Sequence, residues 1–162
     1  MKTILITGTT NGIGRVTAMN LARQGHEIVM ANRNRQKSER LAKEIIQQTG
    51  NTNISLLDLD LSSLSSVRRC ASEFKAAHNK LDILLNNAGM NAPEEVITED
   101  GYESQFAVNN LAQFLLTVEL LPALETASPS HVIFVTSMMH KFGKLDFDSF
   151  KGWKKYNANA SY

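Results

Sequence analysis

The chain has 162 residues, of which 43% are hydrophobic and 20% are charged, and its formal net charge is +1. A globular domain of this size buries about 70% of the surface that its unfolded chain exposes, so a core can form without disulfides. The near balance of 17 basic and 16 acidic residues excludes a general attraction for nucleic acid or an anionic membrane. Any phosphate binding must therefore be local.

The sequence predicts neither a membrane-spanning segment nor a disulfide. Its apolar runs are shorter than the about 18 residues that a membrane helix needs, and Met1 and Lys2 lead straight into a strand pattern instead of a signal peptide. We therefore expect a cytoplasmic protein. The single cysteine, Cys70, follows a helical pattern with Val67 and Phe74, so we interpret it as a small buried hydrophobe without a catalytic role.

Short β-branched and leucine-rich runs alternate with longer segments of helical period, which is typical of βαβ units around a parallel sheet. The runs expected to be strands covered on both faces are Thr3–Ile6, Glu27–Ala31, Ile54–Leu57, Ile83–Asn86 and His131–Thr136. Apolar spacing predicts helices around Leu41 and Ile45, from Leu64 to Phe74 with Ser62 or Ser63 as N-cap, and from Leu111 to Val118.

Successive strands start about 30 residues apart, the size of a βαβ unit, except where a polar loop at 87–101 follows the fourth strand. Right-handed crossovers then give an α/β fold, a doubly wound parallel sheet of Rossmann type with strand order 3-2-1-4-5. We expect one domain over residues 1–162, with Phe142–Tyr156 as an irregular inserted loop.

A glycine-rich turn, TGTTNGIG over Thr7–Gly14, follows the first strand and opens a helix. Glycines there let the backbone approach a pyrophosphate, whose charge meets the free N–H groups at the start of the helix. This is the context of a dinucleotide-binding turn. A glycine-rich turn that binds nothing is equally compatible with this motif alone.

The spacing TGxxxGxG resembles that of the short-chain dehydrogenase/reductase family, and further motifs occur in the family's order. NNAG follows the fourth strand, Asn109 matches an asparagine of the central helix, Ser137 ends the fifth strand, and Tyr162 matches the tyrosine of YxxxK. The resemblance covers the whole chain and implies an oxidoreductase that uses a nicotinamide dinucleotide. The cofactor-binding residues that these motifs imply are Gly8, Thr10, Asn11, Gly12, Ile13, Gly14, Asn87, Ala88 and Gly89.

The end of the second strand indicates which dinucleotide is bound. An acidic residue there would accept hydrogen bonds from an NAD ribose and repel a 2′-phosphate, but the sequence over 31–35 is ANRNR. Arg33 offers a planar fork suited to phosphate, and Arg15 could reinforce it, as basic residues do in family members that prefer NADP. Arg35, Lys37 and Arg40 are interpreted as a solvated helix face. We therefore predict NADP(H) as the cofactor.

Asp60 and Leu61, after the third strand, resemble the pair that contacts adenine in the family, with the carboxylate accepting a hydrogen bond from the exocyclic amine. Asp60 could equally be a charge at a helix N-terminus, and Asp58 is a neighbouring alternative for the same role.

The resemblance implies hydride transfer between the nicotinamide and a carbonyl carbon, with Tyr162 as acid/base, Ser137 holding the substrate oxygen and Asn109 positioning a water. Moving a tyrosine pKa from about 10 to about 7 requires roughly 4 kcal/mol of differential stabilisation of the phenolate. In the family a lysine one helical turn beyond the tyrosine supplies that charge. The chain stops at Tyr162, so we expect a truncated protein that lacks its C-terminal strands and is inactive alone.

Ser137 and Tyr162 are separated by more residues than in most of the family, and the insertion between them resembles the retinol dehydrogenase and protochlorophyllide reductase-like branch. That likeness implies a bulky lipophilic aldehyde, ketone or alcohol as substrate. The residues that could line its pocket, although ordinary packing is equally compatible, are Met138, Met139, Phe142 and Trp153.

Two other hypotheses stay open. The protein could be a sensor or scaffold that binds NADP without catalysis. Alternatively, it could mainly offer an exposed fifth strand to a partner. Val132–Val135 would be an uncovered hydrophobic edge if no strand followed, so we expect either a homo-oligomer or association with a missing C-terminal part. We predict no nucleic-acid partner, and no metal, because His78, His131 and His140 lack metal-ligand spacing.

Overall fold

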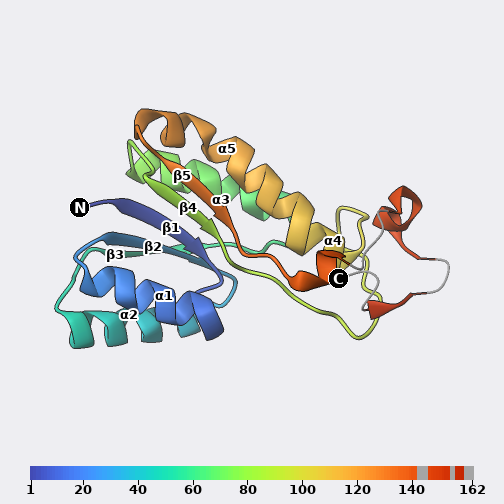
Figure 1. Ribbon diagram of the computed structural model, residues 1–162, viewed down its shortest axis with the longest axis horizontal. Coiled ribbons are helices and arrows are strands. Elements are labelled where there is room, and N and C mark those ends of the chain that lie inside the picture. The colour runs from blue at the N-terminus through green and yellow to red at the C-terminus, as the bar shows by residue number, and fades with distance from the viewer. Residues whose placement is uncertain (142–145, 154–155, 159–162) are drawn as a thin grey trace.

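The computed structural model describes residues 1–141, 146–153 and 156–158. Its centre is a parallel sheet with strand order β3-β2-β1-β4-β5 (Figure 1). The strands are β1 (Thr3–Thr7), β2 (Glu27–Asn32), β3 (Ile54–Asp58), β4 (Ile83–Asn86) and β5 (His131–Phe134). The predicted fold class and strand order are confirmed. The ends of each predicted strand agree with those of an observed strand to within two residues.

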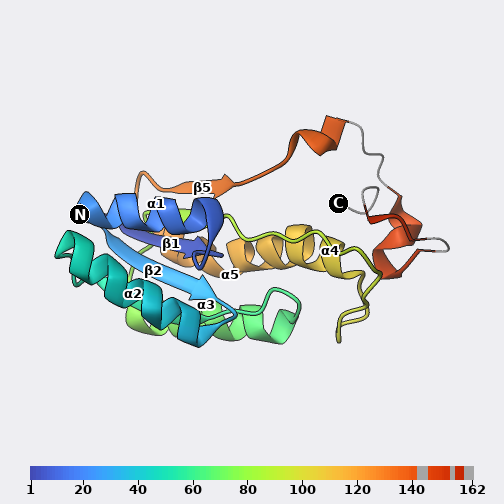
Figure 2. The same ribbon diagram turned by 90° about the horizontal axis from the view of Figure 1, so that it is seen from below.

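Helices cover both faces of the sheet, as Figure 2 shows from below. One face carries α1 (Gly12–Arg23) and α2 (Arg35–Thr49), and the other carries α3 (Leu64–Ala77) and α5 (Ala112–Thr126). A short helix α4 (Ser104–Phe106) and a π-helical turn η1 (Ala107–Leu111) lead into α5. Two 3₁₀ helices, η2 (Met138–Lys141) and η3 (Phe147–Lys151), follow β5, and η3 lies inside the segment predicted to be an irregular loop.

The central strands divide their side chains between two apolar cores. In β1, Ile4 and Ile6 belong to the core under α1 and α2, whereas Leu5 belongs to the core under α3 and α5. All three side chains are fully buried, because a parallel sheet with helices on both faces has no solvated side. Packing on both faces thus holds β1, β2 and β4 in fixed register, and the site forms at the carboxyl ends of these strands.

Helix α3 confirms the predicted start and the predicted buried face. The Ser63 hydroxyl accepts a hydrogen bond from the Ser66 N–H, as an N-cap does, and Phe74 is fully buried. Cys70 is fully buried on the same face. Burial raises the pKa of its thiol to about 12, so the interpretation of Cys70 as a packed hydrophobe is confirmed.

The expectation that the fifth strand is covered on both faces is wrong. Every residue of β5 is exposed, and Phe134 keeps 46% of its surface. Within the described residues β5 pairs with β4 alone, so its other edge is unpaired there. The structure thus agrees with the alternative expectation of an uncovered apolar edge at Val132–Val135.

The continuous helical stretch Ser104–Thr126 is long and apolar enough to cross a membrane by length and composition. In the fold its inner face packs into the core through Leu116, Leu120 and Leu124. A core helix of this kind passes the same test, so the stretch is weak support for a membrane span.

Candidate functional site

A cleft of about 710 Å³ lies at the carboxyl ends of the strands. All strands run in one direction, so the segments that follow them gather at the same end of the sheet (Figure 1). Each of the first four strands contributes the residues that follow it. They are Gly8, Thr10 and Asn11 after β1, Arg33 and Asn34 after β2, Asp60 and Leu61 after β3, and Ala88 and Gly89 after β4.

The glycine-rich turn is packed so tightly that two of its positions have no room for a side chain. A Cβ on Gly14 would lie 2.3 Å from the Gly8 carbonyl oxygen and 2.4 Å from Asn87 Nδ2. A Cβ on Gly8, where φ is +71°, would lie 2.8 Å from the Ala88 Cα. These glycines therefore allow the turn after β1 to lie directly against the NNAG segment after β4.

The start of α1 differs from the starts of α2 and α3. Asn11 precedes α1 in an extended conformation, but its side chain makes no capping hydrogen bond, and the first turn carries no acidic residue. In contrast, Asn34 and Ser63 cap α2 and α3 with their side chains. The Asn11 side chain therefore leaves the first N–H groups of α1 available to an anion.

Hydrogen bonds between the two central strands hold the turn in place. The Thr7 hydroxyl accepts from the backbone N–H groups of Asn87 and Ala88, both at 3.0 Å. The Asn87 side-chain amide donates to the carbonyl oxygens of Thr7 at 2.9 Å and Gly8 at 3.0 Å. Asn87 thus stabilises the floor of the site and does not line the cleft.

Asn32, at the end of β2, is a second amide that holds the turn, and the sequence argument missed it. Its Oδ1 accepts from the Thr9 N–H at 2.7 Å, and its Nδ2 donates to the Thr9 hydroxyl at 2.8 Å. The side chain is buried, so both polar atoms need such partners. A polar residue directly after an apolar strand run was the signal that could have identified it.

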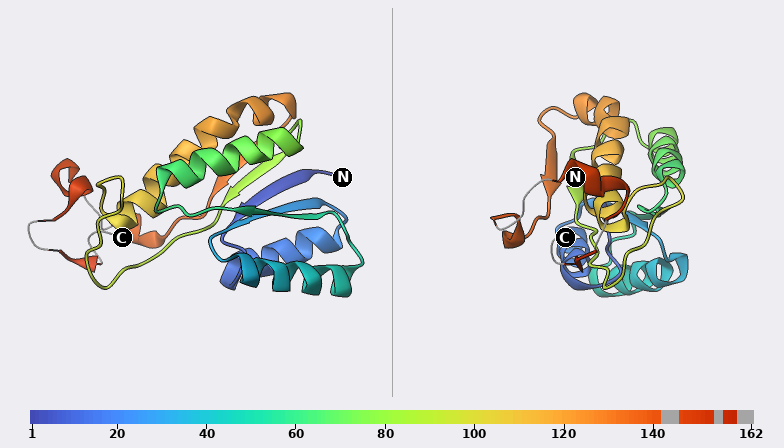
Figure 3. Two further views of the ribbon diagram at one scale, coloured as in Figure 1. Left: turned by 180° about the vertical axis from the view of Figure 1, so that it is seen from behind. Right: turned by 90° about the vertical axis from the view of Figure 1, so that its right-hand side faces the viewer.

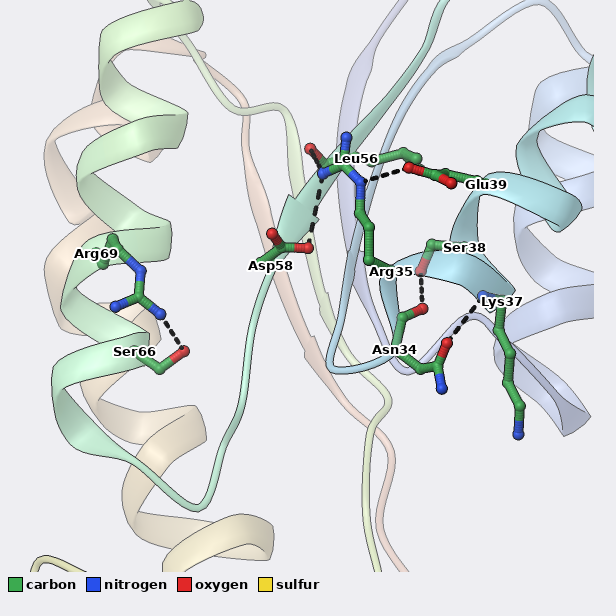
Figure 4. A network of polar contacts seen from close by, with 9 residues as sticks. All are labelled: Asn34, Arg35, Lys37, Ser38, Glu39, Leu56, Asp58, Ser66 and Arg69. Atoms are coloured by element: carbon green, nitrogen blue, oxygen red, sulfur yellow. Dashed lines mark hydrogen bonds and ion pairs between the residues drawn. The ribbon is translucent and has the colours of Figure 1, made fainter.

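Two cations line the cleft after β2, although only Arg33 was predicted to. Lys37 lies in the first turn of α2 and lines the cleft as well, so its interpretation as part of a solvated helix face was incomplete. Arg35 does not line the cleft. It pairs with Glu39 of α2 at 3.1 Å and with Asp58 at the end of β3 at 3.6 Å (Figure 4). The hydrogen bond to Glu39 raises the pKa of Arg35, and these ion pairs keep its charge out of the cleft.

The structure does not bring Arg15 to the cleft. Its guanidinium forms an ion pair with Glu44 of α2, on the outer side of α1 and α2. The cleft is also not lined by Gly12, Ile13 or Gly14. These residues form the first turn of α1 and supply its first backbone N–H groups.

Asp60 and Leu61 line the cleft, whereas Asp58 does not. Asp58 pairs with Arg35, whereas the Asp60 carboxylate accepts from the Ser62 N–H at 2.9 Å and from the Ser62 hydroxyl at 2.6 Å. Asp60 therefore organises the turn before α3 and still borders the cleft.

Of the predicted catalytic residues, Asn109 is the best defined. It lies in the π-helical turn η1, where its Oδ1 accepts from the Met90 N–H and its Nδ2 donates to the Met90 carbonyl, both at 2.8 Å. This pair fixes the chain that follows Gly89. Ser137 is half-buried just beyond β5, and Tyr162 lies outside the described residues.

Of the residues suggested for a lipophilic pocket, Met138 and Trp153 do not line this cleft. Met138 is 75% exposed, and Trp153 is half-buried beside Glu95. Phe142 and the side chain of Met139 lie outside what the structure describes. In the described part of the chain no group of three His, Cys, Asp or Glu side chains is arranged to hold a metal ion.

Residues 2–155 match the family model described as short chain dehydrogenase. The chain is 43% identical to human retinol dehydrogenase 13 and 40% identical to human retinol dehydrogenase 11, which covers 99% of this chain and 49% and 51% of those proteins. An uncharacterized protein from Mycobacterium paratuberculosis superposes with a TM-score of 0.84 at 36% identity, covering 100% of this chain and 56% of that one. A short chain dehydrogenase from Escherichia coli CFT073 solved with NADPH superposes with a TM-score of 0.78 at 26% identity, covering 99% and 64%. The chain spans about half the length of the curated relatives it matches.

Proposed function

The chain belongs to the short-chain dehydrogenase family, and from this premise we propose that the protein is an NADP(H)-dependent oxidoreductase that interconverts a carbonyl and an alcohol. The observation that carries the choice of cofactor is the pair of cations, Arg33 and Lys37, that line the cleft where an NAD-binding site would place a carboxylate. The NADPH complex of the Escherichia coli relative supports the same choice.

The residues of the cleft fit such a dinucleotide in three places. The glycine turn at Gly8 and the open N–H groups of α1 suit the pyrophosphate, because backbone donors and the helix dipole both favour an anion. Arg33 and Lys37 suit the 2′-phosphate. Asp60 borders the cleft on the side proposed for adenine. When bound, the nicotinamide supplies or accepts the hydride.

The chain's own catalytic contribution is proposed to come from Ser137 and Tyr162, with Ser137 holding the substrate oxygen and Tyr162 moving the proton. Asn109 contributes by holding Met90, and through it the segment that places Ala88 and Gly89 at the cleft. The curated relatives named retinol dehydrogenases support a bulky lipophilic substrate.

Cofactor choice is tested by titrating NADPH and NADH into the purified protein. Replacement of Arg33 by alanine should weaken NADPH binding about tenfold, the effect of one hydrogen-bonded charge, and leave NADH binding nearly unchanged. Arg40→Ala is the matched control, since Arg40 is an exposed arginine of α2 that does not line the cleft. Equal affinity for the two dinucleotides in the unsubstituted protein would refute the NADP preference.

Catalysis is tested separately, on the protein extended beyond Tyr162, by NADPH consumption with a panel of hydrophobic aldehydes. Tyr162→Phe and Ser137→Ala should each lower kcat by at least about 100-fold while NADPH still binds, because a missing proton donor affects chemistry more than cofactor binding. Tight NADPH binding without turnover on any substrate would instead support the alternative of a sensor or scaffold.

We further propose that β5 is covered in the complete protein, by residues that follow this chain or by a second copy, and that the protein is cytoplasmic. The exposed apolar run Val132–Val135 supports the first point, because such an edge pairs readily. Intact mass and light scattering on the purified protein test it, and a stable lone monomer of 18.0 kDa would refute it. Cell fractionation tests the location.

A further inference from the structure

We infer that Glu95 and Tyr156 are positioning residues that set how tightly the cleft holds its dinucleotide, because they fix the loop that forms the outer wall of the cleft. This inference rests on the proposed function. The loop, residues 92–101, is called the wall loop below. The segment that holds it, described at residues 146–153 and 156–158, is called the return segment.

The wall loop closes the cleft, and its second half is held by backbone hydrogen bonds, from the Thr98 N–H to the Tyr102 carbonyl at 2.8 Å and from the Ser104 N–H to the Val96 carbonyl at 2.9 Å. Val96, Ile97, Thr98 and Glu99 line the cleft together with the turn before α3. The loop lies beyond the carboxyl ends of the strands, and the return segment runs beside it (Figures 1 and 3). Residues 93–97 are exposed, so the position of the loop depends on polar contacts with neighbouring segments and not on burial.

The first contact joins Glu95 to the return segment. The Trp153 N–H donates to Glu95 Oε1 at 2.6 Å. The preceding Gly152 has φ +129° and ψ 154°, a conformation that is essentially restricted to glycine, and a Cβ there would lie 3.4 Å from both Glu95 Oε1 and Ile97 Cδ1. The bend at Gly152 thus brings the Trp153 N–H to the carboxylate, and it lies against Ile97, which lines the cleft.

The second contact is made by Tyr156. Its hydroxyl donates to the Ala92 carbonyl at 2.8 Å and accepts from Gln105 Nε2, also at 2.8 Å. Gln105 is fully buried at the start of the central helix. Tyr156 therefore connects the beginning of the wall loop to a rigid element.

The return segment is itself anchored on that helix, so it can act as a support. The Glu103 N–H donates to the Phe150 carbonyl at 2.9 Å, and the Phe106 and Phe150 rings stack with centroids 4.0 Å apart. Gln105 Nε2 also donates to the Ala158 carbonyl at 3.1 Å. Stacked aromatic rings and backbone hydrogen bonds give the segment a fixed position relative to α4.

On its other side the wall loop reaches α3. Asp100 Oδ2 accepts from the Leu64 N–H at 2.8 Å, and the Ser63 hydroxyl donates to Glu99. These contacts place the far end of the loop next to Asp60 and the cleft. The wall loop is thus held between α3 and the return segment in addition to its backbone bonds with Tyr102 and Ser104, and the loss of a contact to the return segment loosens that side of the cleft.

An ordered wall lowers the entropic cost of closing on a ligand, because the loop does not have to be immobilised when the ligand binds. Removing the Glu95 or Tyr156 contact returns that cost to the binding step. We expect the dissociation constant for NADPH to rise about fivefold in each case, the effect of one net hydrogen bond.

The test compares four variants of the protein as its gene encodes it. Glu95→Ala and Tyr156→Phe remove the two contacts. Glu94→Ala is the matched control, since Glu94 is the exposed neighbour with the same charge and takes no part in these contacts. Glu95→Gln is the rescue variant, because its amide oxygen can still accept the Trp153 N–H. NADPH binding is followed by fluorescence titration, and the amides of residues 96–101 by hydrogen exchange.

The inference predicts weaker NADPH binding and faster exchange in Glu95→Ala and Tyr156→Phe, with Glu94→Ala and Glu95→Gln within about twofold of the unsubstituted protein. Equal affinities for Glu95→Ala and Glu94→Ala would overturn it, because the lost charge would then be the whole effect. Failure of the unsubstituted protein to bind NADPH or NADH would instead overturn the proposed function, and the inference with it.

Discussion

Replacing Gly14 by alanine tests whether the glycine turn is held as the structure describes. Gly14 lies inside α1, where helix propensity alone favours alanine over glycine by about 1 kcal/mol. The packing predicts the opposite sign. The new Cβ would lie 2.3 Å from the Gly8 carbonyl oxygen and 2.4 Å from Asn87 Nδ2, far inside the normal separation of such atoms.

The magnitude follows from what must move. The Gly8 oxygen is a backbone atom, so the overlap cannot be relieved by a side-chain rotation, and overpacking of this kind costs about 1 to 3 kcal/mol. Moving Asn87 away also breaks its 3.0 Å hydrogen bond to Gly8, at a further cost of about 1 kcal/mol. After subtraction of the gain of about 1 kcal/mol in helix propensity, the free energy of unfolding should fall by about 1 to 3 kcal/mol.

Urea unfolding followed by circular dichroism measures this difference, with Gly12→Ala as the matched control. A Cβ at Gly12 meets nothing within 4 Å, and its φ of +53° costs about 1 kcal/mol for a residue with a side chain. Gly14→Ala should therefore lose up to about 3 kcal/mol against about 1 kcal/mol for Gly12→Ala, and it should also bind dinucleotide poorly. A Gly14→Ala protein as stable as the unsubstituted one would refute the packing argument.

Three further predictions concern buried groups. Burial raises the pKa of Asp82, but a hydrogen bond from the Thr3 N–H and a neighbouring lysine lower it by more. The carboxylate therefore stabilises the fold above its unfolded pKa of about 3.9 and loses this effect as the pH falls through its folded pKa. Asp82→Asn should lower the urea midpoint at pH 7 but not in strong acid, and a difference independent of pH would contradict this. Cys70, with its pKa raised to about 12, should react with a thiol reagent at pH 8 only after unfolding, so rapid labelling of the folded protein would contradict its burial. Asn109→Asp places a carboxylate oxygen against the Met90 carbonyl and should cost about 1 to 3 kcal/mol in thermal unfolding at pH 7, with recovery where the acid is protonated.

The sheet could be predicted because its information is local. The first four strands are short apolar runs between helical segments, and the right-handed crossover rule then leaves one order for them. The coverage of a strand is not local. The run Val132–Val135 is as apolar as β1, but its residues do not indicate whether another element packs on it. In the described structure β5 is exposed.

The candidate site was predictable to the extent that topology gathers the carboxyl ends of parallel strands. Gly8, Arg33 and Gly89 line one cleft for that reason. The side on which a helical cation lies depends on partners far away in sequence. Arg15 pairs with Glu44 of α2 and stays outside the cleft, whereas Lys37 lines it. A motif read along the chain cannot separate these two cases.

Three asparagine side chains near the cleft share a physical logic that the motifs do not express. Asn32 holds Thr9 and Asn109 holds Met90, each by accepting from a backbone N–H and donating to an oxygen, and Asn87 donates to two backbone carbonyls. An amide can do both because it carries a donor and an acceptor. A carboxylate at the same place could not donate, and its charge would repel the anion for which the cleft is proposed. Neutral amides therefore fix the loops of this site without adding a negative charge near Arg33, Lys37 and the start of α1.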